Sequence, residues 1–282
     1  MAIRARAAAS PWPLLALSTA SVIAFIAVYA VFVRTSDGQR VDNAAMAGRA
    51  VAERGTEAAE HLLNTISVGS LVLAIVLLVV QALVRRRPGL SLVAAVVIIG
   101  SVLTAEVLKH SLARPEFVLG PLPAESFPSG HVAVAFSVGV AATLCVPVDL
   151  RRRTALLAVL YGSAIAVATV AAGWHRPSDT AGSLFLVIGF AAAIAALAPV
   201  DSRAPVGAPR ASQWRDADRY LVAGVLALVV GWLVAIGVAG ASQSGTIDWT
   251  LGSAAFLGAC AAILGLASVL MAGLLWALGA SR

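Results

Sequence analysis

Long apolar runs limit this chain to few folds. Eight stretches of 17 to 28 residues carry almost no charge, and about 20 apolar residues are enough for a helix to cross a bilayer. Open sheets cannot cross lipid because their edges leave backbone groups unpaired, and the alternation typical of a membrane barrel is missing from these runs. The sequence therefore predicts an all-α integral membrane protein, a helical bundle with about eight spans. The expected spans are Pro13–Val33, Ile66–Val84, Leu90–Leu108, Val132–Val148, Thr154–Ala172, Thr180–Val200, Tyr220–Val238 and Leu251–Leu278.

The composition supports this fold class and argues against two others. Hydrophobic residues make up 60% of the chain and charged residues 12%, which is unlike a soluble globular protein. The net charge is +6, but the basic residues stand in short clusters between apolar runs. We therefore expect no nucleic-acid partner. The first apolar stretch is about 20 residues long, more than the ~7–15 of a cleaved signal, and favours a retained first span.

The basic clusters also predict the orientation. They fall between alternate spans, so all of them share one side of the membrane if both termini are cytoplasmic. The clusters are Arg4 with Arg6, Arg85–Arg87, Arg151–Arg153, Arg203 with Arg210, Arg215 and Arg219, and Arg282. We expect a multi-pass protein of the cell (plasma) membrane. Between the first two spans, residues 43–63 are expected to form either a short interfacial helix or a solvated linker.

Three polar segments fall on the opposite, extracytoplasmic side. They read "KHSLARP" from Lys109, "FPSGH" from Phe127 and "GWHRPSD" from Gly173, and they hold three of the four histidines and the only lysine. Polar residues are costly at the ends of apolar helices, so their concentration there predicts a functional site.

The second segment has the composition of a phosphate cradle. Pro128 suits a first helical turn, and Ser129 and Gly130 come directly before the fourth span. Backbone N–H groups at a helix start bind anions, and glycine lets an anion approach closely. The hydroxyl of Ser129 adds a donor, and His131 places an imidazole beside the cradle.

The third segment can prepare a nucleophile or base. His175 stands four residues before Asp179, a spacing at which a carboxylate can orient an imidazole and stabilise its cation. Pro177 disfavours helix at Arg176, so the two side chains are expected to meet either on a helical face or through a turn into the sixth span. An oriented neutral imidazole beside an acid is typical of an activated nucleophile.

The first segment supplies two cations, Lys109 and Arg114. An alternative for Lys109 is a simple ion pair with Glu106, three residues earlier on the same helix. That pair would account for the lysine, but it would leave Arg114 and the two histidines without a role.

Together these residues resemble the three-part signature of the phosphatidic acid phosphatase type 2 superfamily. The signature residues are Lys109 with Arg114-Pro115, then Pro128-Ser129-Gly130-His131, then His175 with Asp179. The resemblance implies a metal-independent lipid phosphatase that needs no cofactor, in which His175 attacks phosphorus, Asp179 orients it and His131 protonates the leaving oxygen. It also implies that Lys109, Arg114, Ser129 and the Gly130 amide hold the phosphoryl oxygens, where charge must be stabilised.

Two departures from the family pattern concern its cations. The family usually places Arg-Pro seven residues after the lysine, whereas Arg114 follows Lys109 at five and position 116 is Glu. The Ser-Arg pair that usually precedes the third-motif histidine is replaced by Ala168 and Thr169. Our hypothesis is that Arg176 supplies the missing third cation; the alternative is that its side chain extends to the membrane surface.

The resemblance extends over about residues 66–200 and predicts the domain organisation. We expect a six-helix phosphatase domain at 1–200, a cytoplasmic linker at 201–219 and two additional transmembrane helices at 220–282. The last two helices would complete the bundle or contact a second copy or a partner subunit. The substrate is expected to be a lipid-linked phosphate within the surrounding lipids: a polyprenyl phosphate or pyrophosphate, a glycerolipid phosphate or a lipid-linked sugar phosphate.

Three other functions stay open at this point. A phosphotransferase would pass the phosphoryl group from the same histidine to an alcohol. A metal-dependent hydrolase would use His131, His175 and Asp179 as ligands, against which the two nearby cations argue. A degenerate, non-catalytic protein would only bind or transport a lipid phosphate.

Overall fold

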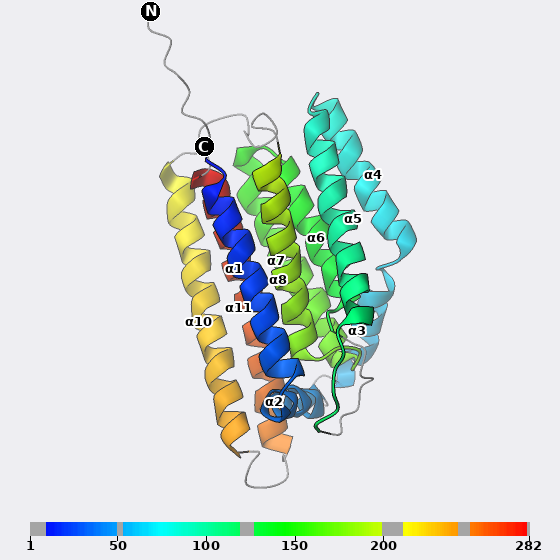
Figure 1. Ribbon diagram of the computed structural model, residues 1–282, viewed down its shortest axis with the longest axis vertical. Coiled ribbons are helices and arrows are strands. Elements are labelled where there is room, and N and C mark those ends of the chain that lie inside the picture. The colour runs from blue at the N-terminus through cyan, green and yellow to red at the C-terminus, as the bar shows by residue number, and fades with distance from the viewer. Residues whose placement is uncertain (1–9, 50–52, 119–126, 199–210, 242–248, 281–282) are drawn as a thin grey trace, which may run out of the picture.

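The computed structural model describes residues 10–49, 53–118, 127–198, 211–241 and 249–280. Within these ranges the chain is helical and contains no strand. Figure 1 shows a bundle of long, roughly parallel helices. The elements are α1 (Trp12–Val28), the π-helical turn η1 (Tyr29–Val33), α2 (Ser36–Ala47), α3 (Glu53–Asn64), α4 (Val68–Val84), α5 (Pro88–Ser111), α6 (Gly130–Cys145), α7 (Val148–Ala171), α8 (Pro177–Leu197), α10 (Ala211–Ala241) and α11 (Trp249–Ala280).

Most of the expected spans are confirmed. Six helical stretches are long and apolar enough to cross a membrane, and a seventh is obtained if the bent pair Thr56–Asn64 and Val68–Val84 is one span. Gly130–Cys145 is also apolar but has only 16 residues, about 24 Å at the rise of an α-helix. The protein is therefore an all-α, multi-pass membrane protein in which the motif-bearing helix α6 is the shortest of the apolar helices.

The segment between the first two spans contains two helices. The range 43–63, expected as a short interfacial helix or a solvated linker, takes in the end of α2 and most of α3, and its residues 50–52 lie outside the described ranges. The side chains of Gln39, Asp42 and Met46 are buried, and α2 lies across one end of the bundle (Figure 1). Thr35 caps α2 by accepting a hydrogen bond from the N–H of Gly38 at 3.1 Å.

The C-terminal helices belong to the same core as the motif-bearing helices. α10 and α11 pack against each other, and α11 also packs against α1, α2, α7 and α8. One continuous hydrophobic cluster contains Phe136 of α6, Ile188 of α8 and Leu274 of α11. The expected linker at 201–219 is helical from Ala211 onward, and its residues 201–210 lie outside the described ranges.

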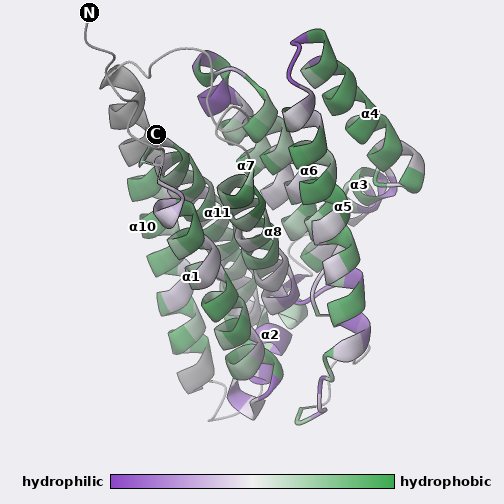
Figure 2. Cartoon of the chain, turned by 45° about the horizontal axis from the view of Figure 1, so that its top comes forward, coloured by the Kyte–Doolittle hydropathy of each residue, from purple (hydrophilic) through white to green (hydrophobic). Residues whose placement is uncertain are grey.

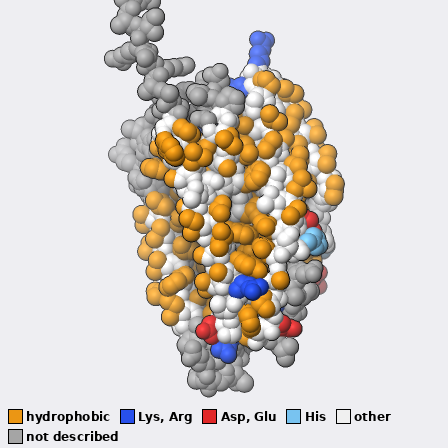
Figure 3. Space-filling view, viewed as in Figure 1, with side chains coloured by type: hydrophobic (Ala, Val, Ile, Leu, Met, Phe, Trp, Pro, Cys, Tyr) orange, Lys and Arg blue, Asp and Glu red, His pale blue; other side chains and the backbone are white. Residues whose placement is uncertain are grey.

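The two ends of the bundle differ in what they carry. α1 begins and α11 ends at one end, whereas α2 lies at the other (Figure 1). Hydrophobic residues dominate the lengths of the helices, and hydrophilic ones gather at their ends (Figure 2). On the face shown in Figure 3, most charged side chains lie toward the end that carries α2.

Candidate active site

The three polar segments converge at the α2 end of the bundle. Lys109 lies in the last turn of α5, His131 in the first turn of α6, and Asp179 in the first turn of α8. Arg114 follows α5 and reaches Asp179 directly. The prediction that these segments share one side of the membrane is thus matched by side-chain contacts among them.

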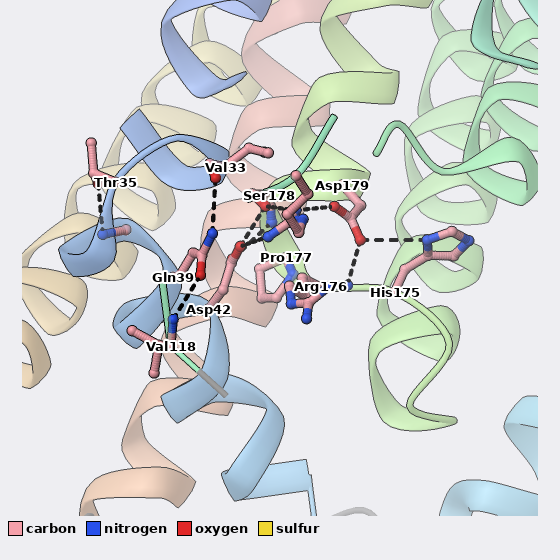
Figure 4. A network of polar contacts seen from close by, with 12 residues as sticks. Val33, Thr35, Gln39, Asp42, Val118, His175, Arg176, Pro177, Ser178 and Asp179 are labelled. Carbon is pink, nitrogen blue, oxygen red and sulfur yellow. Dashed lines mark hydrogen bonds and ion pairs between the residues drawn. The ribbon is translucent and has the colours of Figure 1, made fainter. Parts of the chain in front are cut away.

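His175 faces the carboxylate of Asp179. Its Nδ1 lies 3.5 Å from Oδ2 of Asp179, and both side chains are buried (Figure 4). The helix α8 begins at Pro177 with Arg176 as its N-cap, so His175 lies in the turn before the helix. Of the two arrangements expected from the spacing, the structure has the turn.

The turn before α8 is shaped by the end of α7. Gly173 has a φ of 77°, which glycine adopts without a steric cost. The carbonyl of Thr169 then accepts hydrogen bonds from the N–H groups of Trp174 at 2.9 Å and His175 at 3.2 Å. The position at which the family usually has arginine is therefore a buried threonine whose backbone holds the histidine turn.

Arg114 pairs with two buried carboxylates. Its Nη2 lies 2.7 Å from Oδ1 of Asp179 and its Nη1 lies 3.8 Å from Oδ2 of Asp42. The Nε and Nη1 atoms of Arg114 are buried and make no hydrogen bond to any described residue. Buried donors without acceptors are costly, so two donors remain for a bound anion.

The backbone of the Ser129–Gly130 segment is tied to α8. The N–H of Ser129 donates to the carbonyl of Asp179 at 3.1 Å, and the hydroxyl of Ser183 donates to the carbonyl of Ser129 at 2.7 Å. The Ser129 hydroxyl accepts from the N–H of Val132 at 3.5 Å, which makes Ser129 the N-cap of α6. Pro128 thus lies before the cap, outside the first helical turn that the sequence favours.

His131 lies next to His175 at the helix start. Their ring centroids are 6.5 Å apart with the rings edge to face, and the ring of Trp174 lies 5.3 Å from that of His131. His131 is partly buried. Lys109 is close enough to act on the His131 imidazole electrostatically.

Glu106 does not form the predicted alternative pair with Lys109. Its Oε1 lies 3.0 Å from Nε2 of His110, and both side chains are exposed. His61, in the last turn of α3, is exposed as well. The structure therefore brings two of the four histidines, His131 and His175, into the site and leaves two outside it.

Arg176 is buried and does not extend to the membrane surface. Only 5% of the residue is exposed, and its N–H donates to Oδ2 of Asp179 at 2.9 Å. Burial lowers the pKa of its guanidinium and the charge of Arg114 adds to this, whereas Asp179, Asp42 and Glu116 oppose it. The sequence-based alternative of a snorkelling side chain does not fit this position.

Sequence reasoning missed Asp42, which enters the site from α2. Its Oδ1 accepts from the N–H of Ser178 at 3.1 Å, and its Oδ2 accepts from the Ser178 hydroxyl at 2.5 Å. Burial raises the pKa of Asp42 to about 7 and the charge of Asp179 adds to this, against the lowering effect of Arg114 and the Ser178 hydrogen bonds. A helical repeat of Gln39, Asp42 and Met46 is the signal that could have indicated a buried face here.

The donor set fits an anion better than a metal ion. The Oδ1 atom of Asp179 is occupied by Arg114, and its Oδ2 atom contacts both His175 and the N–H of Arg176. Across the described residues, no group of three or more histidine, cysteine or acidic side chains is arranged to hold a metal ion. An oriented imidazole, a second imidazole and unfilled arginine donors together can carry out nucleophilic attack on a phosphoryl group.

Comparison with known proteins gives one match. Residues 65–203 match the model of a family described as the PAP2 superfamily. This range includes Lys109, Arg114, His131, His175 and Asp179, and it ends just after α8. No curated protein and no solved structure matches the chain.

Proposed function

Through residues 65–203 this chain belongs to the PAP2 superfamily, a family of phosphatases that act on lipid phosphates, and on that premise we propose a phosphohistidine mechanism that uses no metal. The observation that carries the proposal is the buried contact between His175 Nδ1 and Asp179 Oδ2. It leaves the other ring nitrogen, Nε2, as the nucleophile. The contact is long for a hydrogen bond, and such contacts commonly tighten when substrate binds.

The first step forms a bond between His175 Nε2 and phosphorus and breaks the bond from phosphorus to the leaving oxygen. His131 donates a proton to that oxygen, so the lipid product leaves as a neutral alcohol or a lower phosphate. Asp179 stabilises the positive charge that the His175 ring gains. The two rings are 6.5 Å apart between centroids, which puts both within reach of one phosphoryl group.

The second step releases inorganic phosphate. His131, now neutral, takes a proton from water while the water oxygen bonds to phosphorus and the bond to His175 Nε2 breaks. Both histidines then return to their starting forms. The same intermediate could pass to an alcohol in place of water, so product analysis with added alcohols distinguishes a hydrolase from a phosphotransferase.

The phosphoryl oxygens need donors that do not move during the reaction. Arg114 offers its unfilled Nε and Nη1 atoms. Lys109 and Arg176 add positive charge, and Ser129 and the Gly130 N–H add donors at the start of α6. These five residues form the proposed phosphate site, with Arg176 in place of the third cation that the family usually has.

The position of the site in the bundle supports our proposal for the side of the membrane and the class of substrate. The site is at the opposite end of the bundle from the start of α1 and the end of α11 (Figure 1). The basic clusters Arg85–Arg87, before α5, and Arg151–Arg153, in the first turns of α7, lie at the end where α1 starts. With basic loops inside, both termini are cytoplasmic and the site faces the extracytoplasmic side of the plasma membrane. The lipid is then a polyprenyl or glycerolipid phosphate or pyrophosphate, whose tail stays in the bilayer.

The test is phosphate release by the purified protein in detergent with excess chelator. The panel contains polyprenyl phosphates and pyrophosphates and glycerolipid phosphates, and wild type is compared with His175→Ala and with His61→Ala, an exposed histidine in α3. We expect release by wild type and His61→Ala and none by His175→Ala. With radiolabelled phosphate in the substrate, wild type should also carry an acid-labile label that His175→Ala lacks.

Two outcomes would contradict the mechanism. Release that stops on chelation and returns with a divalent ion would point to a metal-dependent hydrolase. Absence of release from every lipid, with equal lipid-phosphate binding by wild type and His175→Ala, would identify a binding or transport protein.

A further inference from the structure

The helix α2 enters the reaction centre from outside the family-matched region. Asp42 is 1% exposed and contacts two residues that flank Asp179. One is Ser178, which donates both its N–H and its hydroxyl to the Asp42 carboxylate. The other is Arg114, whose Nη1 lies 3.8 Å from Oδ2 of Asp42 while its Nη2 pairs with Asp179. Figure 4 shows this carboxylate directed from α2 at the start of α8.

We propose that Asp42 is a positioning residue of the reaction centre, which holds Arg114 and the first turn of α8 so that Asp179 stays directed at His175. This inference rests on the proposed function, since it concerns the same nucleophile. Asp42 acts through Arg114 and Ser178, whose side chains also contact each other, with Nη2 of Arg114 3.5 Å from the Ser178 hydroxyl oxygen. Ser178 precedes Asp179 in the chain, and Arg114 is its ion-pair partner.

The position of Ser178 makes its fixation important. The N–H of Ser178 belongs to the first turn of α8, where helix N–H groups have no partner within the helix. Asp42 supplies that partner, and a carboxylate at a helix N-terminus is also favoured by the helix dipole. Without it, the buried N–H of Ser178 would lack its acceptor and Arg114 would lose its second carboxylate partner, so neither group would be held in its place beside Asp179.

The helix α2 also holds the loop that presents Arg114. The side-chain amide of Gln39 donates to the carbonyl of Pro115 at 2.6 Å and to that of Val33 at 2.9 Å. Its Oε1 atom accepts from the N–H groups of Phe117 and Val118, each at 3.2 Å. One turn of α2 therefore fixes the loop directly after Arg114 through Gln39 and the start of α8 through Asp42.

The C-terminal helices support α2 from its other side. Ala44 and Ala45 of α2 form a small buried cluster with Val238 of α10 and Ala255 of α11. These two helices lie outside the region that matches the PAP2 family. Their packing against α2 gives them a role in the site as well as in the bundle.

The test compares Asp42→Ala with Asp42→Asn. Asparagine keeps an oxygen that can accept from the Ser178 N–H, whereas alanine removes both acceptors. Asp37→Ala is the matched control, because Asp37 lies on the same helix but is exposed and pairs only with exposed Arg40 among the described residues. Each protein is assayed for kcat and KM on one active lipid phosphate. The His175 tautomer is read by ¹⁵N NMR of the imidazoles, assigned by the signal lost in His175→Ala.

For Asp42→Ala we expect kcat to fall by about 10- to 100-fold with KM changed by less than about threefold, because a misplaced nucleophile slows the chemical step. In wild type, His175 should carry its proton on Nδ1, which faces Asp179. Asp42→Ala should give mixed tautomers, and Asp42→Asn should recover most of kcat and the single tautomer. Asp37→Ala should match wild type in both readouts.

Unchanged kcat together with an unchanged His175 tautomer in Asp42→Ala would overturn the positioning role. Failure of Asp42→Asn to recover either readout would overturn it too, since an acceptor for the Ser178 N–H would then not be enough to keep Asp179 directed at His175. The tautomer measurement needs no substrate. A wild-type protein with a single tautomer but no phosphate release would contradict the proposed function, while the comparison among variants would still decide the role of Asp42.

Discussion

Nη2 of Arg114 lies 2.7 Å from Oδ1 of Asp179, although 65 residues separate the two in the sequence. Both side chains are buried, and the other oxygen of Asp179 faces His175. Arg114 therefore fixes the carboxylate from one side while His175 uses it from the other. The same guanidinium keeps two donors unfilled, so in the proposed mechanism it joins Asp179 to the phosphate site.

Replacing Arg114 by lysine should separate these two tasks. Lysine keeps the charge but lacks the planar fork that reaches two groups at once. We expect Arg114→Lys to lower kcat by about 100-fold on a lipid phosphate, measured against Arg40→Lys, which alters an exposed pair. Activity of Arg114→Lys within about threefold of wild type would show that a point charge is enough here.

Arg176→Ala tests whether this arginine is the third phosphate cation. The backbone N–H that donates to Asp179 stays in place, so the variant removes the side chain beyond Cβ, with its charge, and keeps this contact. We expect kcat/KM to fall by about 10-fold or more, as for the loss of a charge-assisted contact made in the transition state. If Arg176→Ala has nearly wild-type turnover while Arg114→Ala has none, Arg176 does not supply the missing cation.

The spans and the polar segments that meet at the α2 end could be predicted because both depend on local patterns. Apolar runs mark the helices, and short motifs put His131 and His175 at helix starts. The length of α6 was less predictable, because its last expected residues, up to Val148, pass through Pro147 into the next helix. A proline N-cap ends one helix and begins another within an unbroken apolar run.

Asp42 escaped prediction for a different physical reason. Its segment has a helical composition with polar residues throughout, which is equally typical of a solvated surface helix. Burial of Gln39 and Asp42 comes from tertiary contacts with the Pro115 loop and α8. The helical spacing of Gln39, Asp42 and Met46 places them on one face, but polar residues at that spacing do not show whether the face is buried. The missing third-motif arginine was visible in the sequence, but the buried position of Arg176 depends on how α8 meets α2.

The raised pKa of Asp42 predicts that stability depends on pH. Its value of about 7 in the folded protein exceeds the ordinary 3.8 because of burial first and the charge of Asp179 second. Between these values the folded state binds a proton that the unfolded state does not, so the free energy of unfolding falls as pH rises. The contribution of Asp42 to the free energy of unfolding is fully present below about pH 4 and is lost as the pH rises through about 7. It amounts to on the order of 4 kcal/mol.

This pH dependence can be measured as the Tm in detergent at several values between about pH 5 and pH 8.5. We expect the Tm of wild type to decrease over this range and that of Asp42→Asn to decrease much less. The charged groups around Asp42 are Arg114, Asp179 and Arg176, and all three remain in the variant. Asp37→Asn should keep the wild-type slope; identical slopes in wild type and Asp42→Asn would contradict the assignment.

Gly182→Ala should disturb the segment before His131. A Cβ atom at Gly182 would lie 2.5 Å from the ring of Phe127, which is fully buried and packs against Phe25 and Tyr29 with centroids 5.1 and 5.6 Å apart. The buried ring must shift within its packed surroundings, so we expect a loss of about 1–3 kcal/mol in stability and reduced kcat. Gly237→Ala, where no atom lies within 4 Å of the added carbon, should be neutral or stabilising, and the same result for Gly182 would show that the ring can shift freely.

Gly48→Ala tests whether the C-terminal helices hold α2 in place for the reaction. Gly48 follows α2 with a φ of −76°, which alanine adopts easily, but its added carbon would overlap the carbonyl of Gly252 in α11. Backbone cannot yield as a flexible side chain can, so α2 must move away from α11. We expect a lower Tm and a fall in kcat larger than the rise in KM, as for Asp42→Ala.

Gly69→Ala in α4 is the control, since its nearest contact, the Ser67 hydroxyl at 3.7 Å, is an ordinary one. A Gly48→Ala protein that loses stability but keeps wild-type kcat would limit the last two helices to completing the bundle.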